Sequence, residues 1–62
     1  MNDKEHREYC KKLGYEIATK VGDHLNILGV EAALLVNFGL TVSYDTLKVI
    51  YSDYKIALDS LD

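Results

Sequence analysis

The sequence contains no proline and no tryptophan, and it has one cysteine, Cys10, among its 62 residues. Without proline, no helix is forced to break by a fixed backbone ring. With one cysteine, no disulfide forms within the chain, and a lone thiol fits a reducing compartment better than secretion. No stretch approaches the roughly 18 consecutive apolar residues of a membrane span, and the N-terminus is charged where a signal peptide is apolar. These absences predict a cytoplasmic protein with no membrane contact.

The length of the chain bears on its oligomeric state. Residues 1–62 have room for a single domain, and a domain of this size buries only about 60% of its unfolded surface. Disulfides, metals or oligomerisation usually reinforce such small folds, and only the last of these is expected here. Apolar residues make up 48% of the chain, which is high for so much surface per residue. We therefore expect self-association, in the form of a homodimer.

Apolar and ambivalent residues recur every three or four positions over residues 6–28, which predicts one long amphipathic helix. This stripe consists of His6, Cys10, Leu13, Ile17, Val21, His24, Leu25 and Leu28. Its members Leu13, Ile17 and Val21 are expected to pack against the third helix.

Caps and glycines set the expected limits of this helix. Asn2 or Asp3 is the expected N-cap and Gly29 the expected residue just past the C-terminus. The stripe keeps its phase through the Gly22–Asp23 pair, so no break is expected there. Gly14 lies on the apolar side, where its missing side chain would let another helix come close.

Residues 30–38 are nearly all apolar and end at Gly39. Their length would suit a buried strand. A short buried helix is favoured, because residues 32–35 have strong helix propensity and no other segment offers a partner strand.

A third helix is predicted from Tyr44, with Ser43 as its N-cap. An apolar stripe runs along it, widened by Ile50 and Ala57, and consists of Tyr44, Leu47, Tyr51, Tyr54, Leu58 and Leu61. Asp45, Asp53 and Asp59 are expected on its solvated side. The expected fold is therefore all-α, a small three-helix domain in the order long helix, short helix, helix.

The third helix also carries the predicted protein interface. Val49 and Ile56 project opposite the stripe, where a second chain would cover them; scattered exposure of such residues is the plainer alternative. Tyrosine is common at interfaces because its ring is apolar and its hydroxyl is polar. Tyr51 and Tyr54 are candidate anchors or core-edge residues, and Tyr15, on the polar side of the first helix, is a candidate exposed contact.

Catalytic and metal-binding patterns are weak. His6 and Cys10 lie one turn apart, but structural zinc needs four ligands, and His24 is too far along a continuous helix to join them. The two are expected simply to pack on the apolar face. No glycine-rich phosphate loop occurs, and three short helices offer little concavity for a cysteine nucleophile. We expect no enzyme activity, no metal and no cofactor.

Nucleic-acid binding is the alternative. Residues 30–50 resemble a repressor-type helix-turn-helix around Gly39-Leu40-Thr41, although Asp45 and Lys48 stand where that motif has apolar residues. The resemblance implies DNA contacts from the residues Thr41, Ser43, Tyr44, Thr46 and Lys48. Residues 29–62 carry two basic and five acidic side chains, which is the wrong balance for binding phosphates.

The sequence thus predicts a non-catalytic interaction module, a small dimeric regulator or inhibitor that binds another protein. Small acidic helical accessory proteins of phages and plasmids act in this way, which is an analogy at the level of fold. The alternative is a degenerate helix-turn-helix transcriptional regulator.

Overall fold

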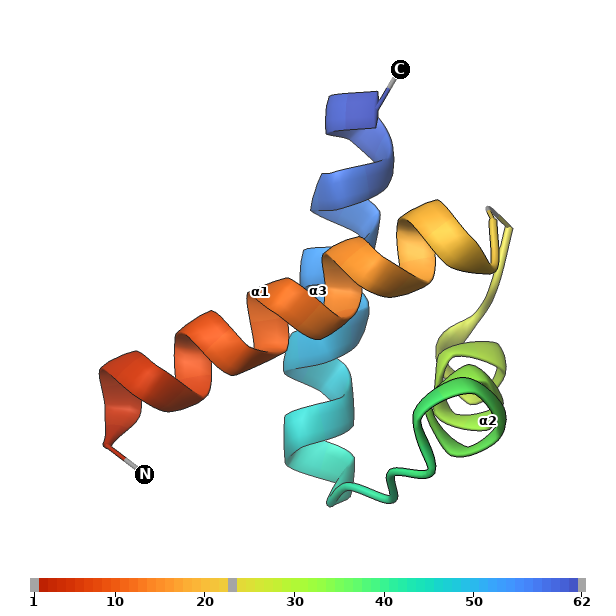
Figure 1. The fold of residues 1–62 in the computed structure, drawn as a ribbon. Coiled ribbons are helices and arrows are strands. Elements are labelled where there is room, and N and C mark those ends of the chain that lie inside the picture. Colours follow the sequence, from red (N-terminus) through yellow and green to blue (C-terminus); the bar gives the residue numbers. More distant parts are fainter. Residues whose placement is uncertain (1, 23, 62) are drawn as a thin grey trace.

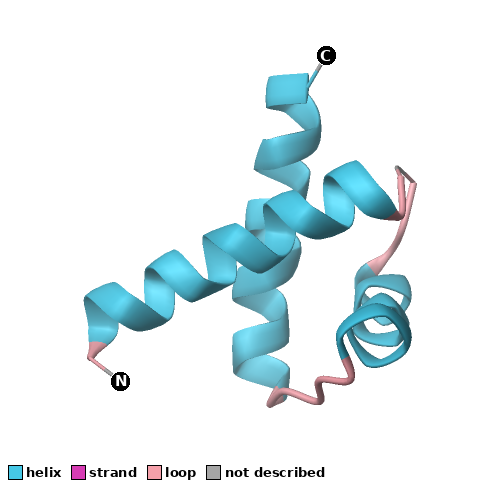
Figure 2. Cartoon of the chain, in the orientation of Figure 1, coloured by secondary structure: helices cyan, strands magenta, loops and turns pink. Residues whose placement is uncertain are grey.

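The computed structural model describes residues 2–22 and 24–61, and all regular structure in this part of the chain is helical (Figure 2). It contains three helices: α1 spans Asp3–Lys20, α2 spans Ile27–Phe38 and α3 spans Tyr44–Leu61. The predicted all-α class and the three helices are confirmed. None of these helices is both long enough and apolar enough to cross a membrane.

The predicted continuous first helix is wrong, because α1 ends at Lys20. The backbone amides of Val21 and Gly22 both donate to the Ile17 carbonyl, at 2.9 and 3.3 Å. Gly22 then turns the chain with a φ of +106°, a conformation that glycine adopts without a side-chain clash. Asp23, the other half of the predicted pair, lies outside the described residues.

A new helix begins only a few residues later. The Asn26 side-chain oxygen accepts a hydrogen bond from the Gly29 amide at 2.8 Å, so Asn26 is the N-cap of α2. Gly29 therefore lies inside α2, and its predicted place past the end of the first helix is wrong. Leu28 belongs to α2, while Leu25 packs against the core from the connecting segment.

The other predicted helix limits are confirmed. Asn2 caps α1 by accepting from the Glu5 amide at 2.8 Å. Ser43 caps α3 by accepting from the Thr46 amide at 3.3 Å. Gly39 ends α2 in the left-handed conformation, with a φ of +64°, as expected of a glycine after a helix.

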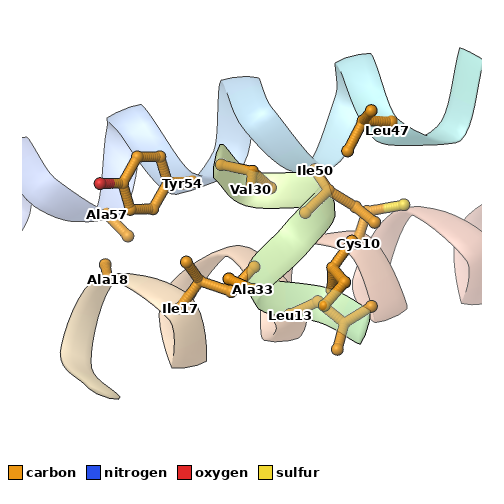
Figure 3. Packing of buried hydrophobic residues seen from close by; sticks show 11 residues of the cluster. Cys10, Leu13, Ile17, Ala18, Val30, Ala33, Leu47, Ile50, Tyr54 and Ala57 are labelled. Carbon is orange, nitrogen blue, oxygen red and sulfur yellow. The ribbon is translucent and has the colours of Figure 1, made fainter. Parts of the chain in front are cut away.

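The core lies between α1 and α3, and α2 packs into the angle between the C-terminal half of α1 and the N-terminal half of α3 (Figures 1 and 3). All three helices contribute buried side chains, which are Cys10, Leu13, Ile17, Ala18, Val30, Ala33, Leu34, Leu47, Ile50, Tyr54 and Ala57. α1 crosses α3 near the middle of both helices (Figure 1). Gly14 lies at this crossing, where an added Cβ would come within 2.7 Å of the Tyr54 backbone nitrogen. The close approach predicted at Gly14 is confirmed.

The crossing also limits how much of each predicted stripe is buried. On α3, Tyr44 and Leu61 are exposed because α1 covers only the middle of the helix (Figure 1). On α1, Leu13 and Ile17 are buried as predicted, whereas Val21 is exposed at the end of the helix. Asp53, predicted on the solvated side of α3, is buried at the crossing.

Candidate protein interface

α2 is apolar on both sides of its axis. Its inner side is buried and consists of Val30, Ala33 and Leu34. On the opposite side, Leu28, Leu35 and Val36 are 65%, 55% and 80% exposed, with the small, exposed Ala32 between them. We call these four residues the outer face of α2. A helix that is apolar all round is normally covered on all sides, so the outer face is the surface of the described chain best suited to contact another chain. The exposure of this face corrects the expectation that the helix is buried.

A shallow groove runs along one edge of the outer face. It is lined by Leu28, Glu31, Ala32, Leu35, Leu40 and Thr41. Glu31 is the single charged residue within Ile27–Phe38, and it is exposed. The groove is therefore an apolar surface with one carboxylate at its rim.

The predicted interface residues on α3 are not gathered into one exposed surface. Ile56 is 59% exposed, but Val49 is partly buried and packs against the core. Tyr51 is half-buried, its ring stacked on Tyr54 with the centroids 6.3 Å apart. Tyr15, on α1, is exposed as predicted.

Tyr54 lies in the core, where a partner could not reach it. Its side chain is 1% exposed. The hydroxyl donates to the Gly22 carbonyl at 2.8 Å and accepts from the Leu25 amide at 3.3 Å. The ring therefore joins α3 to the segment that connects α1 and α2, and Tyr54 is better described as a core residue than as an interface anchor.

Residues of the alternative DNA-binding set lie around the start of α3. The hydroxyls of Ser43 and Thr46 hydrogen bond to each other at 3.1 Å. The Lys48 ammonium lies 3.8 Å from an Asp45 carboxylate oxygen and 5.3 Å from the centre of the Tyr44 ring. The basic side chain of this set is thus engaged by its own helix.

Thr41, the remaining member of that set, lines the groove beside α2. It is exposed, as is Tyr44. The residues of the alternative DNA-binding set therefore lie on the segment between α2 and α3 and on the first turns of α3. The acidic residue Asp45 lies among them.

An ion pair that the sequence did not indicate joins α1 to α3. Arg7 donates to the buried carboxylate of Asp53, and this hydrogen bond raises the pKa of the Arg7 guanidinium. Cys10 is fully buried nearby, and burial, followed by the negative charge of Asp53, raises the pKa of its thiol. A buried thiol with a raised pKa is a poor nucleophile. The Arg7–Asp53 pair links α1 to α3 beside it.

His6 and Cys10, the pair with metal-ligand spacing, have different surroundings. The His6 Nε2 atom lies 3.4 Å from the Thr46 hydroxyl. Among the described residues, no group of three or more His, Cys, Asp or Glu side chains converges on a point where an ion would bind.

Comparisons of the chain with models of protein families, with curated proteins and with solved structures gave no match. The sequence does contain the signal for the outer face, because Leu28, Ala32, Leu35 and Val36 follow helical spacing. Leu28 also continues the apolar spacing of the predicted first helix, so spacing alone does not assign it to α2.

Proposed function

We propose that this protein is a non-catalytic protein–protein interaction module that forms a homodimer through the outer face of α2. The observation that carries the proposal is the continuous exposure of Leu28, Leu35 and Val36 on a helix whose other side is already buried. Exposed apolar side chains that form one patch mark contact sites more often than scattered ones do.

The size of the patch indicates how tight the dimer should be. The exposed parts of its three large side chains amount to roughly two whole aliphatic side chains per copy. Covering them on both copies contributes about 6–12 kcal/mol, taking about 1.5–3 kcal/mol for each side chain. Association itself costs about 4–15 kcal/mol. The expected dimer is therefore weak and depends on protein concentration.

Light scattering during gel filtration, over a concentration series up to high micromolar, tests this proposal. The wild-type chain should approach the mass of a dimer at high concentration, and Val36→Asp should remain a monomer. Ile56→Asp is the matched control, because Ile56 is a similarly exposed aliphatic residue on α3. Circular dichroism would show that each variant is folded.

A wild-type chain that stays monomeric throughout would contradict the proposal. Loss of the dimer in Ile56→Asp but not in Val36→Asp would instead place the interface on α3. Tight, salt-sensitive DNA binding in a gel-shift assay would favour the helix-turn-helix alternative.

A regulatory or inhibitory role would require a further surface that the dimer leaves free. The outward side of α1 carries mixed charges and is exposed at Lys4, Glu8, Lys11 and Lys12.

A further inference from the structure

We propose that the connection between α1 and α2 has two forms, and that the Tyr54 hydroxyl selects the bent one. The bent form consists of two separate helices at an angle (Figure 1). In the joined form, residues 21–26 are helical, α1 and α2 make one helix, and α1 packs into the core of a second copy of the chain. This inference goes beyond the proposed function, because the exchange uses core contacts and leaves the outer face of α2 untouched.

The hydrogen bonds at the break replace those of a continuous helix. In such a helix each amide donates to the carbonyl four residues earlier. The Leu25 amide would therefore donate to the Val21 carbonyl. The Gly22 carbonyl would accept from the Asn26 amide. In the bent form the Tyr54 hydroxyl instead donates to the Gly22 carbonyl at 2.8 Å and accepts from the Leu25 amide at 3.3 Å. One side chain of α3 thus satisfies two backbone groups that would otherwise bond within a helix.

The backbone of the bent form is strained at His24. Its φ is +67°, and it is the one non-glycine residue of the described chain with a positive φ. Residues other than glycine rarely adopt this conformation, because the Cβ atom lies too close to the following carbonyl oxygen. The bent form therefore depends on contacts that offset this strain, and the two hydrogen bonds of Tyr54 are such contacts.

The residues around the break are compatible with a continuous helix. Val21, Leu25 and Leu28 continue the apolar spacing of α1 without a change of phase. A single helix over residues 3–38 would be about 54 Å long at 1.5 Å per residue. The bent chain measures 31 Å along its longest axis, so the two forms differ greatly in shape.

The joined form removes α1 from its own core. While α2 keeps its contacts with α3, an α1 that continues along the axis of α2 no longer crosses α3 (Figure 1). Buried side chains on both sides of the crossing, such as Ile17 and Ile50, would then be exposed. α1 of a second copy carries the same side chains, so a mutual exchange of α1 restores the same contacts in a two-fold dimer.

Tyr54→Phe tests the role of the hydroxyl, because it keeps the buried ring and removes both hydrogen bonds. The helix signal in circular dichroism should rise by about an eighth, since six residues join helices of 18, 12 and 18 residues. Sedimentation velocity should show a dimer that persists on dilution, and small-angle X-ray scattering should give it a largest dimension of at least about 54 Å. Tyr51→Phe is the matched control, because it removes a hydroxyl from the ring stacked on Tyr54.

Gly22→Ala tests the same equilibrium from outside the core. Nothing lies within 4 Å of an added Cβ, but the φ of +106° disfavours alanine in the bent form, whereas alanine favours a helix. Gly39→Ala is its control, since this glycine also has a positive φ and open space around it. Gly22→Ala should give the persistent dimer with added helix, and Gly39→Ala should only lower stability.

All four substitutions are made in the Val36→Asp background, which removes contact through the outer face of α2. A persistent dimer with added helix in Tyr54→Phe or Gly22→Ala, and in neither control, would support the joined form. If both variants stay monomeric, gain no helix or fail to fold, the inference is overturned. Neither result bears on the proposed function, which the wild-type chain and Val36→Asp alone test separately.

Discussion

Gly14 of α1 packs directly against the backbone of α3 at Asp53 and Tyr54. The backbone of α3 lies so near Gly14 that the space for a Cβ is already occupied by the Tyr54 nitrogen and by the Asp53 carbonyl carbon, at 2.7 and 2.9 Å. Both are backbone atoms and cannot rotate away. A glycine in a helix usually lowers stability by about 1 kcal/mol relative to alanine, so its presence here reflects packing between helices.

We predict that Gly14→Ala destabilises the protein although alanine favours the helix. Overpacking costs about 1–3 kcal/mol, and with backbone atoms in the way we expect a net loss of about 2 kcal/mol in urea unfolding. Gly29→Ala is the matched control, since its Cβ would meet the movable Leu25 side chain at 3.2 Å. Measured at concentrations where the chain is monomeric, Gly29→Ala should change stability by less than about 1 kcal/mol. Equal effects of the two substitutions would contradict this explanation.

Single residues also show where sequence reasoning stops. The position of Gly14 on the apolar side of a stripe was enough to predict a close approach. Asp53 is expected on the solvated side from its position around the predicted helix, with Asp45 and Asp59. Its partner, Arg7, lies 46 residues away, and no local pattern links the two. An ion pair between helices depends on the angle at which they cross, which spacing along one helix does not contain.

All three helices begin at a capping residue whose side chain accepts a hydrogen bond from a backbone amide. The capping residues of α1 and α3 were predicted from the sequence. α2 also begins at such a residue, Asn26, but the regular apolar spacing across residues 21–28 concealed it. Periodicity records which positions are apolar and carries no information about φ. The break between α1 and α2 follows from the positive φ of Gly22 and from the hydrogen bond that Asn26 accepts as N-cap. Apolar spacing indicates neither of them.

The glycine that ends α2 can be tested by substitution. Gly39 has a φ of +64° and nothing within 4 Å of an added Cβ, so any cost of substitution comes from the backbone conformation alone. Gly39→Ala should lower the free energy of unfolding by about 1 kcal/mol. Gly39→Asn should cost less, because asparagine tolerates the left-handed region. Thermal or urea unfolding of the two variants measures which substitution lowers stability more. If Gly39 were instead needed for space, the larger asparagine would cost as much as alanine or more.

The described part of the chain is a crossed pair of helices, with α2 in the angle between the C-terminal half of α1 and the N-terminal half of α3 (Figure 1). α1 and α3 share the most extensive contact, while α2 contacts each of them less. The crossed pair therefore carries most of the core, whereas α2 buries one side and leaves its outer face exposed. The helices and most of the core residues were predictable from apolar spacing. Spacing also places the residues of the outer face of α2 on one side of that helix, but their exposure was not predictable, because it follows from how the three helices are arranged.

This arrangement has a consequence for how fast the chain folds. The helices with the largest shared contact are the first and the last, so a long segment must close into a loop before their contacts form, and such distant pairing slows folding. Ile50→Val on α3 and Val30→Ala on α2 both remove methyl groups from fully buried positions, which should cost about 1 kcal/mol or more each. In stopped-flow experiments, Ile50→Val should mainly slow folding, and Val30→Ala should mainly accelerate unfolding. The reverse pattern would mean that the contacts of Val30 on α2 form in the transition state, and that the crossing of α1 over α3 forms after it.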